Sequence, residues 1–168
     1  MNFVVSNYNI NFNGVPPNYA KIDKYVSRSA QPLKEDIAWL KEQGVTDVIN
    51  FRTLVVEKID FDEKYEVEKC GMIYHNIPST TRNPKEENVL QFLSIVDKIK
   101  AHSGKVHIHC MAGADRTGMY AFIFKAMKNI GTLAENEKEW IAKGHNIERY
   151  PDLRNWANSF IKGSILHK

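Results

Sequence analysis

Residues 105–130 read KVHIH CMAGADRTG MYAFIFKAMKNI and combine three kinds of local structure. Residues 105–109 form a short run typical of a strand. The stretch 116–130 predicts a helix, with Gly131 beyond it as a stop signal. Between the two lies a loop of mostly small residues. A strand, a tight loop and a helix in this order place the loop beyond the carboxyl end of a strand, where open α/β sheets bind ligands.

The sequence upstream of this stretch alternates helices and strands. Apolar spacing and glycine stop signals predict helices over 33–43 and 61–70 and strands over 45–51 and 72–77. Parallel strands need long crossover connections, so this alternation favours parallel pairing.

The remaining helices are marked by possible caps. Asn83, Pro84 and Glu86 predict the start of one helix, and Thr132 with Glu135 predicts a capping box for another. A last helix is expected over about 152–161. We therefore expect one α/β domain over residues 1–168, with a central, mostly parallel sheet flanked by helices. Its first 31 residues are expected to be irregular or to form edge strands.

Composition sets broad limits on function. The chain has 168 residues and a formal net charge of +3, which is too weakly basic to argue for nucleic acid as a partner. Its two cysteines make no disulfide framework, and no run approaches a membrane span. No secretory signal is recognisable at the N-terminus. We expect a monomeric cytoplasmic protein.

The loop residues point to anion chemistry. Successive backbone N–H groups at a helix N-terminus form a cradle for an anion, and Gly113 lets the backbone approach a ligand closely. A cysteine in such a cradle, here Cys110, is favoured as the nucleophilic thiolate. Arg116 has a planar fork that matches two phosphate oxygens.

The string His-Cys-Met-Ala-Gly-Ala-Asp-Arg-Thr-Gly over 109–118 resembles the signature loop of the protein tyrosine phosphatase superfamily, in its small bacterial-type dual-specificity form. The segments 27–32 and 48–52 are also similar to that group. The resemblance implies a phosphatase-type phosphate-binding loop between strand and helix. It also implies catalysis without a metal or other cofactor.

The resemblance assigns a role to each loop residue. Cys110 would attack phosphorus and form a phosphocysteine, and Thr117 would donate its hydroxyl to the sulfur as it leaves. His109 would orient the loop. Arg116 would bind phosphate together with the backbone N–H groups of the loop. The residues expected to bind phosphate are Met111, Ala112, Gly113, Ala114, Asp115 and Arg116.

The general acid is the point at which this chain departs from the family. The family carries an aspartate in the loop after the 72–77 strand, but here residues 78–85 contain no carboxylate. Asp115 is the first candidate, although it could equally brace the loop by accepting backbone hydrogen bonds. Further candidates, in order, are Asp60 and Asp62, then Glu86 and Glu87.

Several other side chains have two readings. Arg52, Arg82 and Lys85 would either surround the pocket or be solvated surface charges. Cys70 would be a helix-end thiol or, as in some relatives, a disulfide partner of Cys110.

The expected activity is hydrolysis of a phosphorylated protein or a small-molecule phosphate. The leading hypothesis is a protein tyrosine or dual-specificity phosphatase. An inositol polyphosphate or phosphoinositide phosphatase is the second hypothesis. The third is a phosphate-binding module without turnover.

Overall fold

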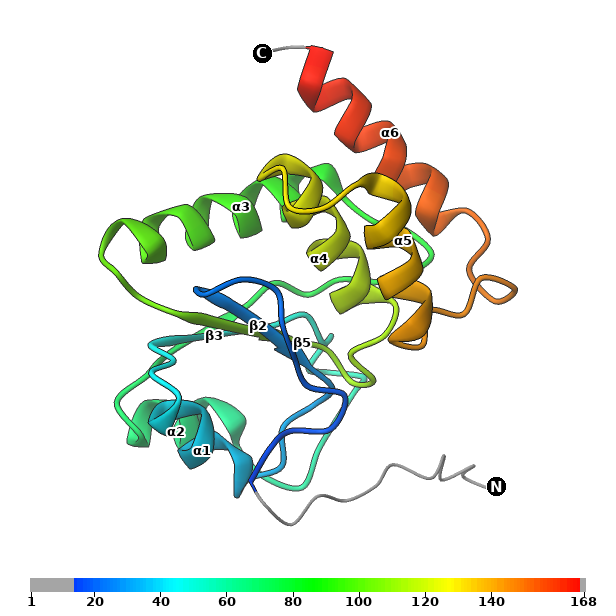
Figure 1. Ribbon diagram of the computed structural model, residues 1–168. Coiled ribbons are helices and arrows are strands. Elements are labelled where there is room, and N and C mark those ends of the chain that lie inside the picture. Colours follow the sequence, from blue (N-terminus) through cyan, green and yellow to red (C-terminus); the bar gives the residue numbers. More distant parts are fainter. Residues whose placement is uncertain (1–13, 167–168) are drawn as a thin grey trace, which may run out of the picture.

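The computed structural model describes residues 14–166, and its centre is a five-stranded sheet (Figure 1). The strand order is β1-β2-β5-β3-β4. The bounds are Ala20–Lys21 for β1, Val26–Ser29 for β2, Asp47–Asn50 for β3, Ile73–Asn76 for β4 and Val106–His109 for β5. β1 pairs antiparallel with β2, and β2, β5, β3 and β4 run parallel to one another. The prediction of a mostly parallel sheet is confirmed.

The strand register places the carboxyl ends of the parallel strands at one edge. His109 pairs with Ser29 on one side and with Asn50 on the other, and Asn50 pairs with Asn76. The loops that follow β2, β3, β4 and β5 therefore all begin at this edge. Because β5 is an interior strand, the loop after it, residues 110–116, lies among the other three.

Within residues 14–166, six helices cover the two faces of the sheet (Figure 1). The helices α1 (Asp36–Glu42) and α2 (Glu63–Lys69) lie on one face. On the other lie α3 (Glu86–Ala101), α4 (Arg116–Met127), α5 (Leu133–Ala142) and α6 (Leu153–Leu166).

Two apolar cores separate along β3 because successive strand residues face opposite ways. Val48 packs in the core under α1 and α2, whereas Ile49 packs in the larger core under the other helices. The helix α4 lies within this larger core, and its residues 117–124 are all buried. The helix that follows residues 110–115 is thus enclosed by protein over residues 117–124.

Two details differ from the sequence predictions. Asn83 does not cap α3, because that helix begins at Glu86 with Lys85 at the cap position and no side-chain capping bond. The second strand, Val26–Ser29, is an interior strand, so residues 14–31 provide more than an edge. The capping box of Thr132 and Glu135 is confirmed.

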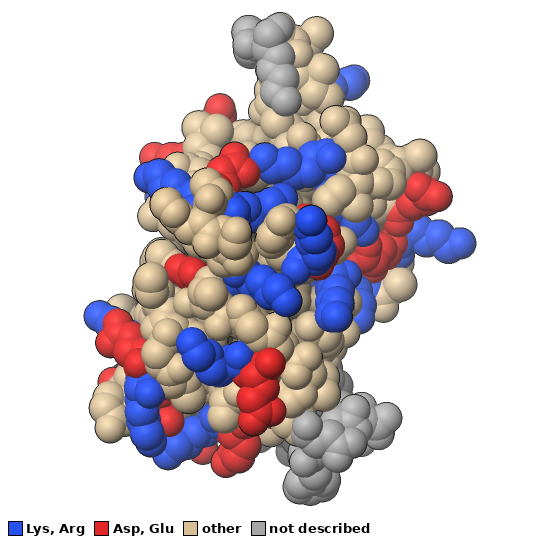
Figure 2. All heavy atoms as spheres, turned by 60° about the vertical axis from the view of Figure 1, so that its left-hand side comes forward, with Lys and Arg blue, Asp and Glu red and all other residues tan. Residues whose placement is uncertain are grey.

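Charged groups are spread over the surface, and Figure 2 shows Lys and Arg side chains gathered across the middle of one face. Within residues 14–166, no helix combines the length and apolar character needed to cross a membrane.

Candidate active site

Residues 110–116, the Cys110 loop, border a cavity of about 380 Å³ through Cys110, Met111, Ala112, Asp115 and Arg116. Cys110 follows the interior strand β5, and Arg116 begins α4. Cys110 is only 2% exposed, although its side chain lines this cavity. Loops after β3 and β4 supply the opposite wall through Glu57 and Ser79. The cavity therefore lies at the carboxyl edge of the parallel strands, as the sequence predicted.

The carbonyl groups of the Cys110 loop are held from behind by donors outside the loop. Gln31 N donates to Met111 O at 2.9 Å, Asn18 Nδ2 to Ala112 O at 3.4 Å, Arg28 Nη2 to Gly113 O at 2.7 Å, and Trp140 Nε1 to Ala114 O at 3.1 Å. In a planar trans peptide, the carbonyl and the following N–H point in opposite directions. Successive N–H groups of the loop are therefore directed away from this frame and toward the cavity.

Gly113 is the position where the loop requires glycine. Its φ is +67°, and a Cβ there would lie 2.4 Å from Ala30 N and from Ser29 O. Its N–H donates to Cys110 Sγ at 3.2 Å. The turn at Gly113 thus directs a backbone donor onto the sulfur and lets the loop pack against the end of β2.

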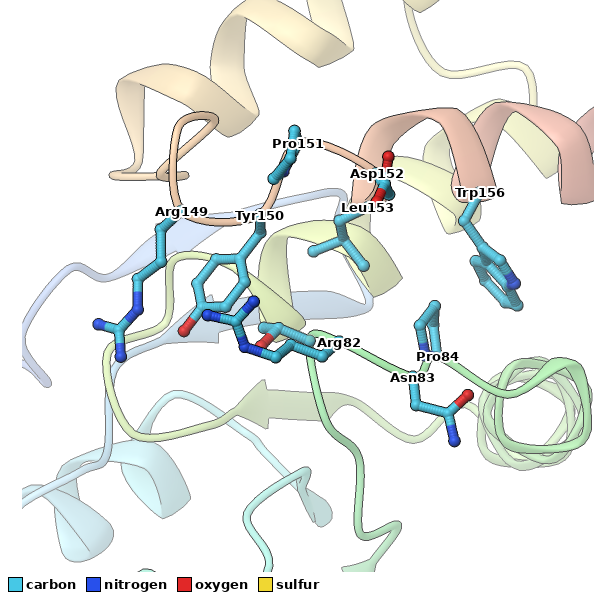
Figure 3. A pocket seen from close by; sticks show the side chains of 10 residues that line it. Arg82, Asn83, Pro84, Arg149, Tyr150, Pro151, Asp152, Leu153 and Trp156 are labelled. Carbon is cyan, nitrogen blue, oxygen red and sulfur yellow. The ribbon is translucent and has the colours of Figure 1, made fainter.

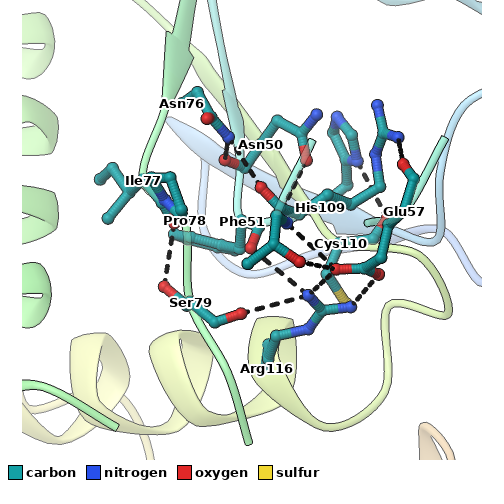
Figure 4. A network of polar contacts seen from close by, with 12 residues as sticks. Asn50, Phe51, Glu57, Asn76, Ile77, Pro78, Ser79, His109, Cys110 and Arg116 are labelled. Carbon is teal, nitrogen blue, oxygen red and sulfur yellow. Dashed lines mark hydrogen bonds and ion pairs between the residues drawn. The ribbon is translucent and has the colours of Figure 1, made fainter. Parts of the chain in front are cut away.

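Arg116 faces the cavity and is clamped by a residue that the sequence did not predict, Glu57. Nη1 and Nη2 of Arg116 lie 2.5 and 2.6 Å from the two carboxylate oxygens of Glu57 (Figure 4). Nη1 also donates to Ser79 O at 3.2 Å. Burial alone would lower the pKa of Arg116, but Glu57 and the nearby Cys110 outweigh it and raise that pKa.

Glu57 is fixed as an anion in this position. Burial would raise the pKa of its carboxyl, but hydrogen bonds from Arg116 and Thr53 outweigh burial and lower it to about 2. Its carboxylate occupies the terminal edge of the guanidinium, and a guanidinium has a second edge formed by Nε and one terminal nitrogen. No spacing in the sequence marks Glu57, because a turn over residues 53–57 brings it to Arg116.

His109 anchors the loop from below through a buried polar network. Its Nε2 lies 2.6 Å from Glu63 Oε1, and its Nδ1 lies 3.0 Å from Cys110 O. Asn50 Nδ2 and Arg52 Nη2 lie 2.7 and 3.2 Å from Glu63 Oε2. Burial would raise the pKa of Glu63, but His109, Arg52 and Gln31 lower it to about 2.

Thr117 is completely buried in the first turn of α4. Its hydroxyl oxygen has no hydrogen-bond partner among the described residues. A buried hydroxyl without a partner is costly. The donation from Thr117 to Cys110 that the resemblance implies therefore stays a prediction.

Among the predicted general acids, Asp115 is the one that lines the cavity containing Cys110 and Arg116. Its Oδ1 accepts from His145 Nδ1 at 2.7 Å and from Asn146 N at 2.9 Å. Both bonds fall on the same oxygen, and no described residue donates to Oδ2. His145 holds the carboxylate of Asp115 from the loop between α5 and α6.

The other acid candidates are placed elsewhere. Asp62 caps α2 by accepting from Tyr65 N at 3.0 Å, and it lines a neighbouring cavity that does not contain Cys110. Glu86 and Glu87 lie in the first turn of α3. Neither these three nor Asp60 contributes to the wall of the cavity that contains Cys110.

The basic residues separate into different roles. Arg52 is buried and paired with Glu63, so it does not surround the pocket. Lys85 does not line the cavity, and its Nζ lies 3.9 Å from Oε1 of Glu87. Arg82 is exposed beside the cavity mouth and lies over the ring of Tyr150, which itself lines the cavity.

Cys70 and Cys110 are both free thiols. Cys70 lies before the first residue of β4, whereas Cys110 follows the last residue of β5. The register between these parallel strands separates the two by the length of a strand, at roughly 3.3 Å per residue. A disulfide requires Cα atoms within about 7 Å, so these cysteines do not form one in this fold.

Together, the inward N–H groups, the cysteine and the arginine define a cysteine-based phosphatase of the protein tyrosine phosphatase superfamily. Residues 23–135 match the family described as "Polymorphic toxin system, DSP-PTPase phosphatase". The chain belongs to this family. No individually curated protein sequence matches the chain.

Solved structures of phosphatases have the same fold. P. aeruginosa TpbA shares 22% identity at a TM-score of 0.66, covering 87% of this chain and 84% of its own. The catalytic domain of SIW14 from S. cerevisiae shares 19% identity at a TM-score of 0.68, covering 88% and 85%. PTPMT1 shares 21% identity at a TM-score of 0.70, covering 89% and 99%.

Proposed function

We propose that this protein hydrolyses phosphate monoesters through a phosphocysteine at Cys110. The observation that carries the proposal is the convergence of three groups on one cavity: the Cys110 sulfur, the inward N–H groups of the loop and the Arg116 guanidinium. Preorganised donors of this kind stabilise the charge of a phosphoryl transition state without reorganisation. The buried frame behind the loop supplies that preorganisation.

In the first step, the Cys110 thiolate attacks phosphorus. A sulfur–phosphorus bond forms while the bond to the leaving oxygen breaks, and Arg116 with the loop N–H groups holds the three equatorial oxygens. The leaving oxygen takes a proton from the carboxylic acid form of Asp115. In the second step, water attacks phosphorus, its proton passes to the Asp115 carboxylate, and the thiolate leaves with a hydrogen bond from Thr117.

Asp115 is preferred as the proton donor over Glu57, the other carboxylate of the cavity. Glu57 has a pKa of about 2 and stays paired with Arg116. Both oxygens of Glu57 accept from Arg116, so neither is open to a leaving group. Both donors to Asp115 reach Oδ1, and none among residues 14–166 reaches Oδ2, which is therefore the atom that would carry the proton.

The proposed substrates are of the protein tyrosine or dual-specificity type, in a cytoplasmic setting. TpbA, which has the same fold, is described in complex with phosphotyrosine. The second candidate is an inositol polyphosphate or phosphoinositide substrate. It is favoured by the exposed Arg82 and Arg149 beside the cavity, and SIW14, which also shares the fold, is described as a PP-IP phosphatase.

The test is a Cys110→Ser variant assayed on phosphotyrosine peptides, phosphoserine peptides and inositol phosphates. Turnover of every substrate that the wild type accepts should be lost, while phosphate binding is kept because the frame and Arg116 are intact. A Cys110→Ser protein that keeps most of the wild-type rate would show that another group is the nucleophile. A variant that also loses phosphate binding would place the anion site elsewhere.

A further inference from the structure

A second pocket adjoins the cavity that contains Cys110. This rim pocket, of about 240 Å³, lies between the loop after β4 and the loop between α5 and α6. Figure 3 shows Arg82 of the first loop beside the ring of Tyr150, which belongs to the second loop, and Arg149 on the far side of that ring. Thr81, Arg149 and Tyr150 line both the rim pocket and the cavity of Cys110. The rim pocket therefore lies directly beside the cavity of Cys110, with these three residues at their common boundary.

The two arginines of the rim pocket share one aromatic ring. The guanidinium carbon of Arg82 lies 5.3 Å from the centre of the Tyr150 ring, and that of Arg149 lies 5.4 Å from it. Such contacts hold a guanidinium in place. A guanidinium has five N–H donors in its plane, and neither guanidinium donates to another described residue, so the donors of Arg82 and Arg149 remain for an anion.

Neither arginine is neutralised by an ion pair within residues 14–166. The other arginines of this region all have acidic partners: Arg28 has Glu139, Arg52 has Glu63, Arg116 has Glu57 and Arg154 has Glu137. One carboxylate, that of Asp152, also lines the rim pocket and offsets part of its charge. Two cations against one anion leave a net positive pocket.

The position of Arg82 indicates how the positive charge of the rim pocket affects the choice of substrate. The loop after β4 is where related phosphatases carry an aspartate, and here it carries a cation and no carboxylate over 78–85. A cation beside the leaving-group side of the cavity favours substrates that carry another negative group at that side. Phosphate is the group that matches planar, bidentate arginine donors.

We propose that Arg82 and Arg149 form a second phosphate-binding subsite, so that the preferred substrates are small molecules with two or more phosphate groups. This rests on the proposed function, because the first phosphate must occupy the Cys110 loop. The second phosphate binds in the rim pocket and is not hydrolysed there. Its role is to orient the ester for attack by Cys110.

The experiment compares phenyl phosphate with benzene bisphosphates of ortho, meta and para spacing. The measured quantity is the ratio of kcat/KM for a bisphosphate to kcat/KM for phenyl phosphate. Two exposed charge-assisted contacts should raise this ratio to about tenfold for the best spacing in the wild type. In the Arg82→Gln/Arg149→Gln variant the ratio should fall toward one. Singly and doubly phosphorylated peptides form a second arm, which distinguishes a peptide source of the second phosphate from a small molecule.

Lys85→Gln is the matched control, since it removes one positive charge from the same loop at a residue outside both pockets. The control should keep the wild-type ratio. A wild-type ratio near one for every spacing and for the peptides would overturn the subsite. An equal fall in Lys85→Gln would also overturn it, because general surface charge would then explain the preference.

Binding separates the subsite from the chemistry. Calorimetric titration of the Cys110→Ser protein with phenyl phosphate and with the same bisphosphates needs no turnover. Tighter binding of a bisphosphate, lost in Arg82→Gln/Arg149→Gln, supports the subsite even if the wild type proves inactive. Equal affinity for both ligands contradicts it, whether or not phenyl phosphate is hydrolysed.

Discussion

Arg28 and Arg116 serve the same loop from its two sides, and their surroundings differ. Arg28 lies behind the loop, is 1% exposed and donates to the carbonyl of Gly113. Burial lowers its pKa, although Glu139 and Cys110 oppose that change. Arg116 lies in front and binds a carboxylate, Glu57, across an open cavity. At the back of the loop, each carbonyl accepts a hydrogen bond from protein. At the front, the N–H groups and the Arg116 guanidinium are directed at the cavity that contains Cys110.

This difference indicates how the loop acquires its chemistry. The donors behind the loop hold its carbonyl groups and so fix the orientation of its peptide planes. In each plane the N–H group points away from the held carbonyl, toward the front of the loop. Under the proposed function, rigidity at the back would hold the donors at the front in place for an anion. Substitutions at the front should reduce catalysis with little effect on stability, and substitutions at the back should affect both.

The largest effect is expected at the front, for Arg116→Lys. A lysine keeps the charge but can serve only one carboxylate or phosphate oxygen at a time, so both the Glu57 clamp and the phosphate fork are lost. We expect a loss of about 3 kcal/mol in transition-state stabilisation, on the scale of an oxyanion donor. Measurement of kcat/KM on an aryl phosphate checks this. Wild-type kinetics would mean that phosphate binds elsewhere, and unchanged thermal unfolding is the expected control.

The next effect is expected at the back, for Gly113→Ala. The new Cβ would meet the backbone at Ala30 and Ser29, and the positive φ adds strain of about 1 kcal/mol or more. Both kcat/KM and the free energy of unfolding should therefore fall. Gly163→Ala is the matched control, because a Cβ there meets nothing within 4 Å. If Gly113→Ala behaves like Gly163→Ala, the tight packing at the back is not required.

A smaller effect is expected for Asp115→Asn. Alkyl phosphates have poor leaving groups that need a proton. The substitution should therefore reduce their rate of hydrolysis by a factor about ten or more times larger than the factor for activated aryl phosphates. Rates on the two substrate types over a range of pH provide the measurement. Equal losses on both, with the same pH profile, would show that Asp115 only braces the loop through His145.

The smallest effect concerns the pH dependence of stability. The pKa of Glu63 is lowered from 4.5 to about 2 in the folded protein, so its contribution is complete above 4.5 and is lost as the pH falls toward 2. Between pH 7 and pH 4 this should remove about 1 kcal/mol from the free energy of unfolding. Urea titrations of the wild type and Glu63→Gln would check it. The variant should be less stable at pH 7 and should lose less on acidification, and an equal loss in both would exclude Glu63 as the source.

The sequence predicted the parts of the site that are contiguous in the chain. Cys110, Gly113 and Arg116 lie in one strand–loop–helix unit, and short-range pattern is enough to place them there. Glu57 and His145 were not predicted as site residues because each reaches the loop from a distant turn. Only the turn over 53–57 and the connection between α5 and α6 bring them to Arg116 and Asp115.

The same reasoning explains the errors in the fold. Asn83 has the side chain of a typical helix cap, but α3 begins at Glu86, and the cap position is therefore Lys85. The strand Val26–Ser29 lacks a long apolar run, and its interior position depends on pairing with β5, far along the chain. Its buried polar residues Ser27 and Ser29 are satisfied by His107 of that strand.

The central claim is that Cys110 takes the phosphoryl group. The most direct measurement is rapid acid quenching of the wild type during turnover of an aryl phosphate, followed by mass spectrometry of the peptide that contains Cys110. A single phosphoryl group on Cys110, absent from the Cys110→Ser protein, is the predicted result. A burst of product with the phosphoryl group on another residue, or with none on the protein, would contradict it.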